Sequence, residues 1–287
     1  MVVILCLLLV WLSLPPAMAQ GTPLRDQWIE AIAGSPLDEP LQVVSEERRY
    51  SVSGSVFARI PHPLETLAIE LQSAAAWCEI MFLHLNVEAC LHEEEEGADA
   101  TGLHVYVGRQ DYQPLTEAER LDLNLRLVAA YDQYFATVLE GDQGPYSTRA
   151  FRLQLQAMPY SEDESLVHLR YSLVFGLPAR LAMSAYFTFG GRHREGFTVE
   201  GYEADGEPRY VGGVRGMIER NVMRFYLALE VHLETRMVSE SERLDERLKR
   251  WFAATERYPR QLREMDEQAY LEQKRREYAR QQALRSE

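Results

Sequence analysis

The chain has 287 residues and a formal net charge of −14, with 44 acidic residues against 30 lysines and arginines. Such a composition argues against nucleic-acid binding, which needs a basic face to displace counterions, and against simple electrostatic docking on anionic membranes. The length suits one large domain, or one domain with a helical extension.

An export signal is predicted over residues 1–19. Met1–Leu14 is almost wholly apolar, Pro15 and Pro16 follow, and Ala17-Met18-Ala19 has the small-residue pattern of a cleavage site. No lysine or arginine precedes the apolar run, so an uncleaved anchor that tethers the protein to a membrane is the alternative to cleavage after Ala19. We therefore expect an exported protein, periplasmic or secreted, with no stable membrane span once the signal is removed.

Two cysteines remain after Cys6 leaves with the signal. Cys78 and Cys90 form an even pair in an exported chain, where a disulfide is chemically permitted and a short loop favours it. Two buried free thiols, acting as small apolar side chains, are the alternative.

The N-terminal half predicts a lead-in and then a change from strand to helix. Residues 20–49 are polar and contain three prolines, which indicates a short helix near Trp28 followed by loop. Residues 50–60 alternate like a strand, and from Leu64 the apolar period becomes helical. We expect one helix at this point, with a strand beginning near Phe82.

Strands dominate the middle of the chain. Apolar and polar residues alternate over 121–127, 149–157 and 167–175, with short turns between, which is typical of an antiparallel meander. The acidic run Glu93–Glu96 indicates a solvated turn. The neighbouring histidines His84, His92 and His104 lack the tight spacing of zinc ligands, so the sequence predicts no metal site.

The C-terminal third is mostly helical. Residues 179–189 indicate a short helix or crossing, and a hairpin is predicted around Asp205-Gly206. Ile218, Val222, Phe225, Leu229 and Leu233 then recur at steps of three and four, which predicts an amphipathic helix over 217–235. Charged helices with a thin apolar stripe follow from 239 to about 285, interrupted at Pro259.

No motif in the chain predicts catalysis or a cofactor. The Gly-x-Ser-x-Gly elbow, the phosphate loop and the dinucleotide fingerprint are all missing from the sequence. Gly212–Gly216 superficially resembles an anion-binding turn, but its spacing favours a tight strand-to-helix turn in which glycine supplies a positive φ.

The order of elements predicts an α+β fold in which an antiparallel sheet grips a long C-terminal helix, followed by a charged helical tail. This layout resembles the START-like lipid-binding superfamily, also called SRPBCC, over residues 50–236, on element order and not on a sequence motif. We take 50–238 as the START-like domain and 239–287 as the tail. The expected single helix after the first strand, the crossing at 179–189 and the tail depart from the usual pattern.

The resemblance implies an apolar cavity between the sheet and helix 217–235. The residues that would line it are Leu153, Leu155, Leu169, Tyr171, Leu173, Phe197, Ile218, Val222, Phe225 and Leu229. The alternative is that these side chains simply fill a core. Arg220 and Arg224 share a helix face, where they either form surface or structural pairs or bind the headgroup of a ligand.

Three functions follow for testing. The first is an exported, non-catalytic protein that binds or carries a hydrophobic or lipid-like molecule. The second is a cell-envelope interaction protein whose tail docks on a protein partner. The third is a cyclase-like or hydrolase-like enzyme that uses a cavity tyrosine, arginine or glutamate.

Overall fold

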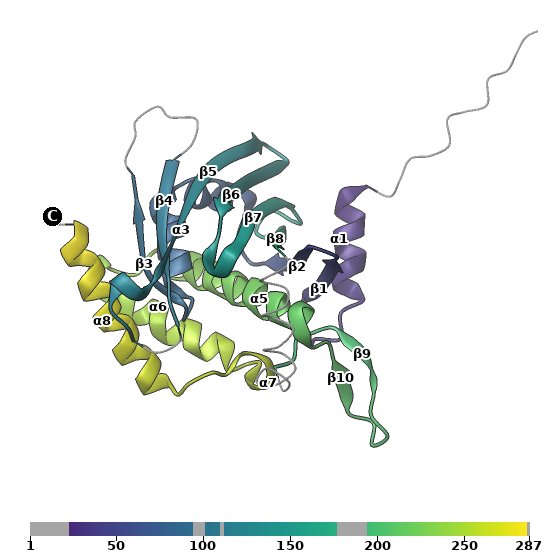
Figure 1. Ribbon diagram of the computed structural model, residues 1–287. Helices are drawn as coiled ribbons and strands as arrows, with labels where there is room; N and C mark the ends of the chain where they lie inside the picture. Colours follow the sequence, from purple (N-terminus) through teal and green to yellow (C-terminus); the bar gives the residue numbers. More distant parts are fainter. Residues whose placement is uncertain (1–22, 94–100, 110–111, 177–193, 286–287) are drawn as a thin grey trace, which may run out of the picture.

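The computed structural model describes residues 23–93, 101–109, 112–176 and 194–285. The predicted signal at 1–19 and the predicted crossing at 179–189 lie outside these residues. Within these ranges the chain forms a large sheet of eight strands and a two-stranded hairpin (Figure 1).

The large sheet is antiparallel throughout, with the strand order β1-β2-β8-β7-β6-β5-β4-β3. Its strands are β1 (Leu41–Arg48), β2 (Ser51–Ile60), β3 (Val87–His92), β4 (Thr101–Val107), β5 (Glu119–Tyr131), β6 (Tyr134–Gln143), β7 (Thr148–Pro159) and β8 (Ser165–Phe175). From β3 to β8 each strand pairs with the next along the chain, so the predicted meander is confirmed and extended. The hairpin of β9 (Val199–Tyr202) and β10 (Pro208–Tyr210) turns at Gly206 as predicted.

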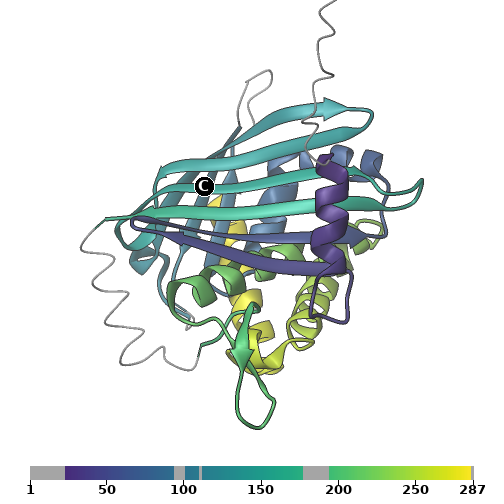
Figure 2. The same cartoon turned by 90° about the vertical axis from the view of Figure 1, so that its right-hand side faces the viewer.

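Helices cover both faces of this sheet (Figure 2). They are α1 (Leu24–Ala33), α2 (Leu64–Leu71), α3 (Ala74–Leu83), α5 (Gly213–Glu234), α6 (Glu240–Thr255), α7 (Pro259–Leu262) and α8 (Glu267–Arg285). Helix α1 packs on the outer face, where Trp28 contacts the rings of Phe57 and His168. Helices α2, α3 and α5 lie on the inner, concave face.

The expected single helix after the first strand is wrong, because the chain forms two. Ser73 accepts a hydrogen bond from the backbone N–H of Ala76 at 3.3 Å and so caps a second helix, α3. That helix continues through Phe82 to Leu83, where we expected a strand, and β3 begins only at Val87. This departure from the START-like pattern therefore disappears.

Strands β1 and β6 were not predicted from the sequence, for different reasons. Strand β1 buries only Leu41 and Val43 before it becomes charged, so its alternation is too short to notice. Strand β6 buries five consecutive residues, 135–139, and therefore shows no period of two.

Helix α5 crosses the sheet over β2 at Gly54. A Cβ atom at Gly54 would lie 3.0 Å from the carbonyl oxygen of Ile218 and 3.1 Å from Cγ1 of Val222. The missing side chain thus lets the helix backbone approach the strand closely, and Ile218 and Val222 are fully buried at this crossing. The turn before the helix uses Gly213 at φ +61, as predicted for a strand-to-helix turn.

The C-terminal tail is helical as predicted, and it packs on the body of the protein. Leu248 and Trp251 of α6 are buried, and the Trp251 indole donates to the carbonyl oxygen of Arg224 at 3.1 Å. Trp251 also stacks on Tyr270 of α8. The thin apolar stripe that motivated a partner-docking tail is therefore occupied by contacts within the chain.

Helix α8 covers the open edge of the sheet with polar side chains. Lys274 donates to the carbonyl oxygen of Val87 at 2.5 Å, and the side-chain oxygen of Gln281 accepts from the N–H of Cys90 at 2.7 Å. Lys274 and Glu277 are both fully buried and pair with each other at 2.7 Å. Backbone groups that an edge strand leaves open are thus bonded by helix side chains.

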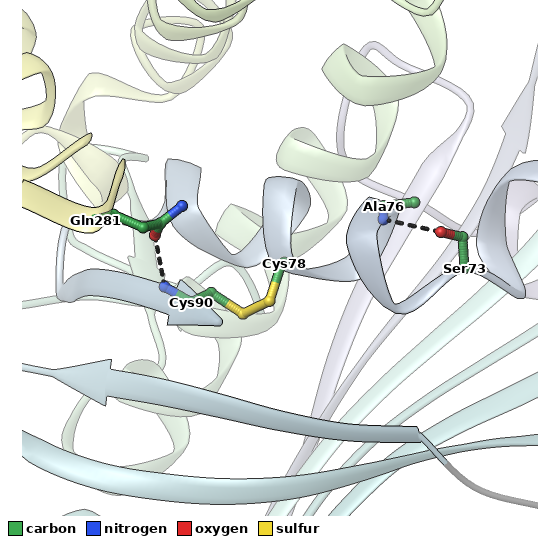
Figure 3. Close-up of a disulfide and its surroundings, with 5 residues drawn as sticks. All are labelled: Ser73, Ala76, Cys78, Cys90 and Gln281. Carbon is green, nitrogen blue, oxygen red and sulfur yellow. Dashed lines mark hydrogen bonds between the residues drawn. A yellow bond between two sulfur atoms is a disulfide. The ribbon is translucent and has the colours of Figure 1, made fainter. Parts of the chain in front are cut away.

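A disulfide joins Cys78 of α3 to Cys90 of β3, with their Cα atoms 5.1 Å apart (Figure 3). It fixes the helix that lines the concave face to the edge strand that α8 covers. Among the described residues, no single helix is long and apolar enough to span a membrane. Helices α2 and α3 together reach that length and composition, but they are bent by 92°.

Gly54→Ala should destabilise the protein, because the new Cβ would press on the backbone of α5. We expect a loss of about 1–3 kcal/mol in the free energy of unfolding, measured by urea denaturation. Gly34→Ala is the matched control, since a Cβ there meets nothing closer than 3.5 Å. Equal effects of the two substitutions would show that the close crossing does not matter.

Removing the disulfide by Cys78→Ser and Cys90→Ser together should lower the free energy of unfolding by about 3 kcal/mol, because the short loop between these residues gains freedom in the unfolded chain. Urea denaturation of this variant, beside the parent with and without reductant, measures the effect. If reductant lowers the free energy of unfolding of the double variant as much as that of the parent, the destabilisation by reductant does not come from the Cys78–Cys90 bond.

Candidate functional site

A cavity of about 670 Å³ lies between the concave face of the sheet and α5. Its walls come from α3, the strands β3, β4, β5, β7 and β8, the β6–β7 turn and α5, with Arg194 and Glu264 adding to one side. Most of the surface that lines it is apolar. The apolar wall is formed chiefly by Val105, Leu121, Phe151, Tyr171, Leu173 and Phe225.

Aromatic rings give this wall its shape. Tyr171 lies between Phe151 and Phe225, with ring centroids 5.1 Å and 5.8 Å away. Burial raises the pKa of Tyr171 above its ordinary value, so its hydroxyl keeps its proton. Tyr171 therefore offers the cavity a neutral ring.

The ten residues expected to line a cavity divide into two groups. Tyr171, Leu173 and Phe225 line it. The other seven are buried in the core and do not line it: Leu153, Leu155, Leu169, Phe197, Ile218, Val222 and Leu229. For the residues on α5 the division follows the geometry of the helix, because the stripe that contains Ile218 and Val222 packs directly on the sheet at Gly54.

A neighbouring stripe of α5 faces the cavity instead. Met217, Arg220, Asn221, Arg224 and Phe225 recur at spacings of three and four and all line it. The sequence contained this second stripe, but its polar members made it look like a solvent-facing side of the helix. Arg220 and Arg224 are in fact buried, so surface pairing is wrong for both.

Arg224 is held in a buried ion pair. It donates to Oε1 of Glu264 at 2.9 Å and to the carbonyl oxygen of Leu262 at 3.1 Å. Arg194 donates to the same Glu264 oxygen at 3.0 Å. Two arginines thus share one carboxylate at this side of the cavity.

His84, at the end of α3, is the other polar group in the wall. Its Nδ1 accepts a hydrogen bond from the backbone N–H of Asn86 at 3.2 Å, which leaves the ring proton on Nε2. Burial, aided by the charge of Arg224, lowers the pKa of His84 to about 3, so the ring is neutral at physiological pH.

The rim of the cavity includes a turn with unusual backbone. Tyr146 and Ser147, between β6 and β7, have positive φ values of 56° and 64°. Residues other than glycine rarely adopt this backbone conformation. The N–H of Tyr146 donates to Oε2 of Glu119 at 2.7 Å, which holds the turn against β5.

Glu219 of α5 has a structural position. It is fully buried and accepts hydrogen bonds from Ser45 Oγ, from the backbone N–H groups of Phe197 and Thr198, and from Thr198 Oγ1. It therefore ties α5 to β1 and to the segment before β9. Its neighbour Arg215 donates to Ser45 and Glu200 and completes the same network.

Sequence reasoning missed His84, Arg194 and Glu264 as parts of one site. They lie far apart in the chain and meet only because α3, the segment before β9 and the α7–α8 connection converge beside α5. His84 was noticed only as a candidate metal ligand. No group of three or more candidate metal ligands occurs within the described ranges.

The pH dependence of stability should report the buried His84. The unfolded chain protonates this ring near pH 6.5, whereas the folded chain does so only near pH 3. Stability must therefore fall as the pH drops below about 6.5, by roughly 1 kcal/mol per pH unit for this one proton. In His84→Leu that part of the slope should vanish in urea denaturation between about pH 6 and pH 4; an unchanged slope would mean that the folded ring is charged.

No protein-family model and no curated protein matches the chain. Solved structures do resemble it. Human STARD10 aligns with a TM-score of 0.37 and 9% identity over 51% of this chain and 62% of its own. The Zhui aromatase/cyclase of Streptomyces sp. R1128 aligns with a TM-score of 0.37 and 12% identity over 73% of this chain and 95% of its own.

A START superfamily protein from Mycobacterium smegmatis aligns with a TM-score of 0.32 and 12% identity over 50% of this chain and 88% of its own. The assignment of the fold rests on the chain's own topology. Strand β2, the helix pair α2 and α3, the meander β3–β8 and the long helix α5 follow in the helix-grip order, with β1 added at the edge beside β2. The described part of the chain therefore has a START-like helix-grip fold.

Proposed function

We propose that this protein binds or carries a hydrophobic, lipid-like molecule in the cavity between its sheet and α5. The observation that carries the proposal is the cavity itself, whose volume of about 670 Å³ has a largely apolar wall. Ligand pockets in proteins typically measure about 300–1,000 Å³ and combine apolar walls with a few polar groups. The cavity fits this description.

Binding without turnover is supported by the state of the polar groups in the wall. His84 is neutral and its Nδ1 is occupied by a backbone N–H, so it is poorly placed to accept a proton from a ligand. Glu264 is engaged by two arginines. Tyr171 keeps its proton. These groups can orient a ligand, and we propose no chemical step for them.

Export forms part of the same proposal. Its support is the apolar segment and cleavage pattern of residues 1–19, together with the Cys78–Cys90 disulfide, which is a bond typical of oxidising compartments. The ligand would then be a molecule of the cell envelope or the exterior.

Filling the cavity should abolish uptake of an apolar probe. We expect the protein to bind the neutral dye Nile red, and Leu173→Trp to weaken that binding at least about tenfold because the indole occupies the space. Fluorescence titration measures the affinity, and thermal unfolding shows that the variant folds. Val105→Trp fills the same cavity from another strand and guards against a folding defect in the first variant.

The matched control is Val44→Trp, which adds the same ring at an exposed site on β1. It should bind Nile red as the parent does. Equal binding by the parent, Leu173→Trp and Val105→Trp, all folded, would contradict the proposed cavity function.

A further inference from the structure

The wall of the cavity is positively charged although the protein as a whole is strongly acidic. Among the described residues, the cavity is lined by the arginines Arg109, Arg194, Arg220 and Arg224 and by one carboxylate, that of Glu264. The chain carries a net charge of −14. The excess of positive charge is therefore local, and it lies where a ligand would sit.

Two buried hydrogen-bond donors in this wall, on His84 and Arg224, have no acceptor among the described residues. His84 is 95% buried, since its exposed fraction is 5%, and its Nε2 has no hydrogen-bond partner among the described residues. The Asn221 side chain lies close enough to His84 to raise the pKa of the ring against the effect of burial. It makes no hydrogen bond of normal geometry with Nε2. A neutral ring with Nδ1 as acceptor presents Nε2–H, so this atom is a buried donor.

Arg224 contributes a second such donor. It is 97% buried, with an exposed fraction of 3%. Its Nη2 donates both to the carbonyl oxygen of Leu262 and to the carboxylate of Glu264. Its Nε has no hydrogen-bond partner within the described part of the chain. A donor left unpaired in a buried site costs free energy that an acceptor of the ligand would recover.

The pairing of Glu264 argues against a ligand with a positively charged head. Glu264 already serves Arg194 and Arg224, so the described wall offers no carboxylate for the ammonium of a cationic or zwitterionic ligand. A neutral alcohol could accept from one donor but would leave the arginine charge uncompensated. A negatively charged oxygen group satisfies both the donors and the charge, and bonds to such a group are the stronger ones.

We propose that the ligand is an apolar molecule with one anionic head, such as a carboxylic acid with an aliphatic or aromatic body, whose head is bound by His84 and Arg224 beside Asn221. The inference rests on the proposed cavity function and adds the charge of the ligand. Arg220 lies on the same stripe of α5 and donates to the carbonyl oxygen of Glu195 at 3.3 Å, which places a further positive charge next to the head.

Matched probes of one chain length test the proposal in the full chain. Dodecanoate, 1-dodecanol and dodecyltrimethylammonium each compete with Nile red, and their affinities are compared in the same preparation. We expect dodecanoate to bind at least about tenfold more tightly than the alcohol, and the ammonium compound to bind worst. Because the three tails are the same, the ratio isolates the head.

His84→Leu and Arg224→Met should each reduce the preference for dodecanoate over dodecanol by about tenfold, because the anionic head loses more than the alcohol when one donor is removed. Arg224→Lys keeps the charge and should retain part of the preference, which guards against misfolding of the methionine variant. Arg215→Met is the matched control, because Arg215 is on the same helix but bonds Ser45 and Glu200 outside the cavity. Its preference should stay that of the parent.

The outcomes separate the two proposals. If Nile red and dodecanol bind but dodecanoate binds no more tightly than dodecanol, the anionic head is wrong and the apolar cavity stands. If the preference exists but survives in His84→Leu and in both Arg224 variants, the head is bound elsewhere and the assigned site is wrong. If none of the probes binds, the cavity function itself is overturned.

Discussion

The crossing of α5 over β2 at Gly54 is the contact on which the rest of the structure depends. The absence of a side chain on the strand lets the helix backbone lie against the sheet, which buries Ile218 and Val222. Glu219, between them in sequence, is then bonded by four donors from β1 and from residues 197–198. With the helix fixed in position and rotation, its next stripe, from Met217 to Phe225, must face the cavity.

The C-terminal helices support the same arrangement from outside. Trp251 reaches the backbone of Arg224, and the α7–α8 connection brings Glu264 to the guanidinium of that arginine. Helix α8 then covers β3 through Lys274 and Gln281. Burial lowers the pKa of Lys274 while Glu277 opposes that shift, so each of the two buried charges offsets part of the cost of burying the other. The tail is thus part of the wall that supports the candidate site.

The apolar wall of the cavity and its buried donors have complementary effects on ligand binding. An apolar wall gives affinity for a hydrophobic body, whereas buried donors at one side discriminate among heads, because an unmatched polar group in a buried site is costly. His84 serves this purpose better as a neutral donor than as a cation, since a proton on both nitrogens would remove its bond to Asn86. The disulfide secures α3, which carries His84 near its end, to the edge strand.

The sequence by itself determined the antiparallel meander, the long amphipathic helix and the fold class, because periods of two and near four are local properties of strands and helices. It could not reveal β6 or the buried face of α8, because one strand is covered on both faces and the helix buries polar residues such as Lys274 and Glu277. Nor could it separate lining from core, since Phe225 and Leu229 look alike in the pattern. Only the tertiary structure decided that, by setting the rotation of α5, and only the convergence of distant segments placed His84, Arg224 and Glu264 around one cavity.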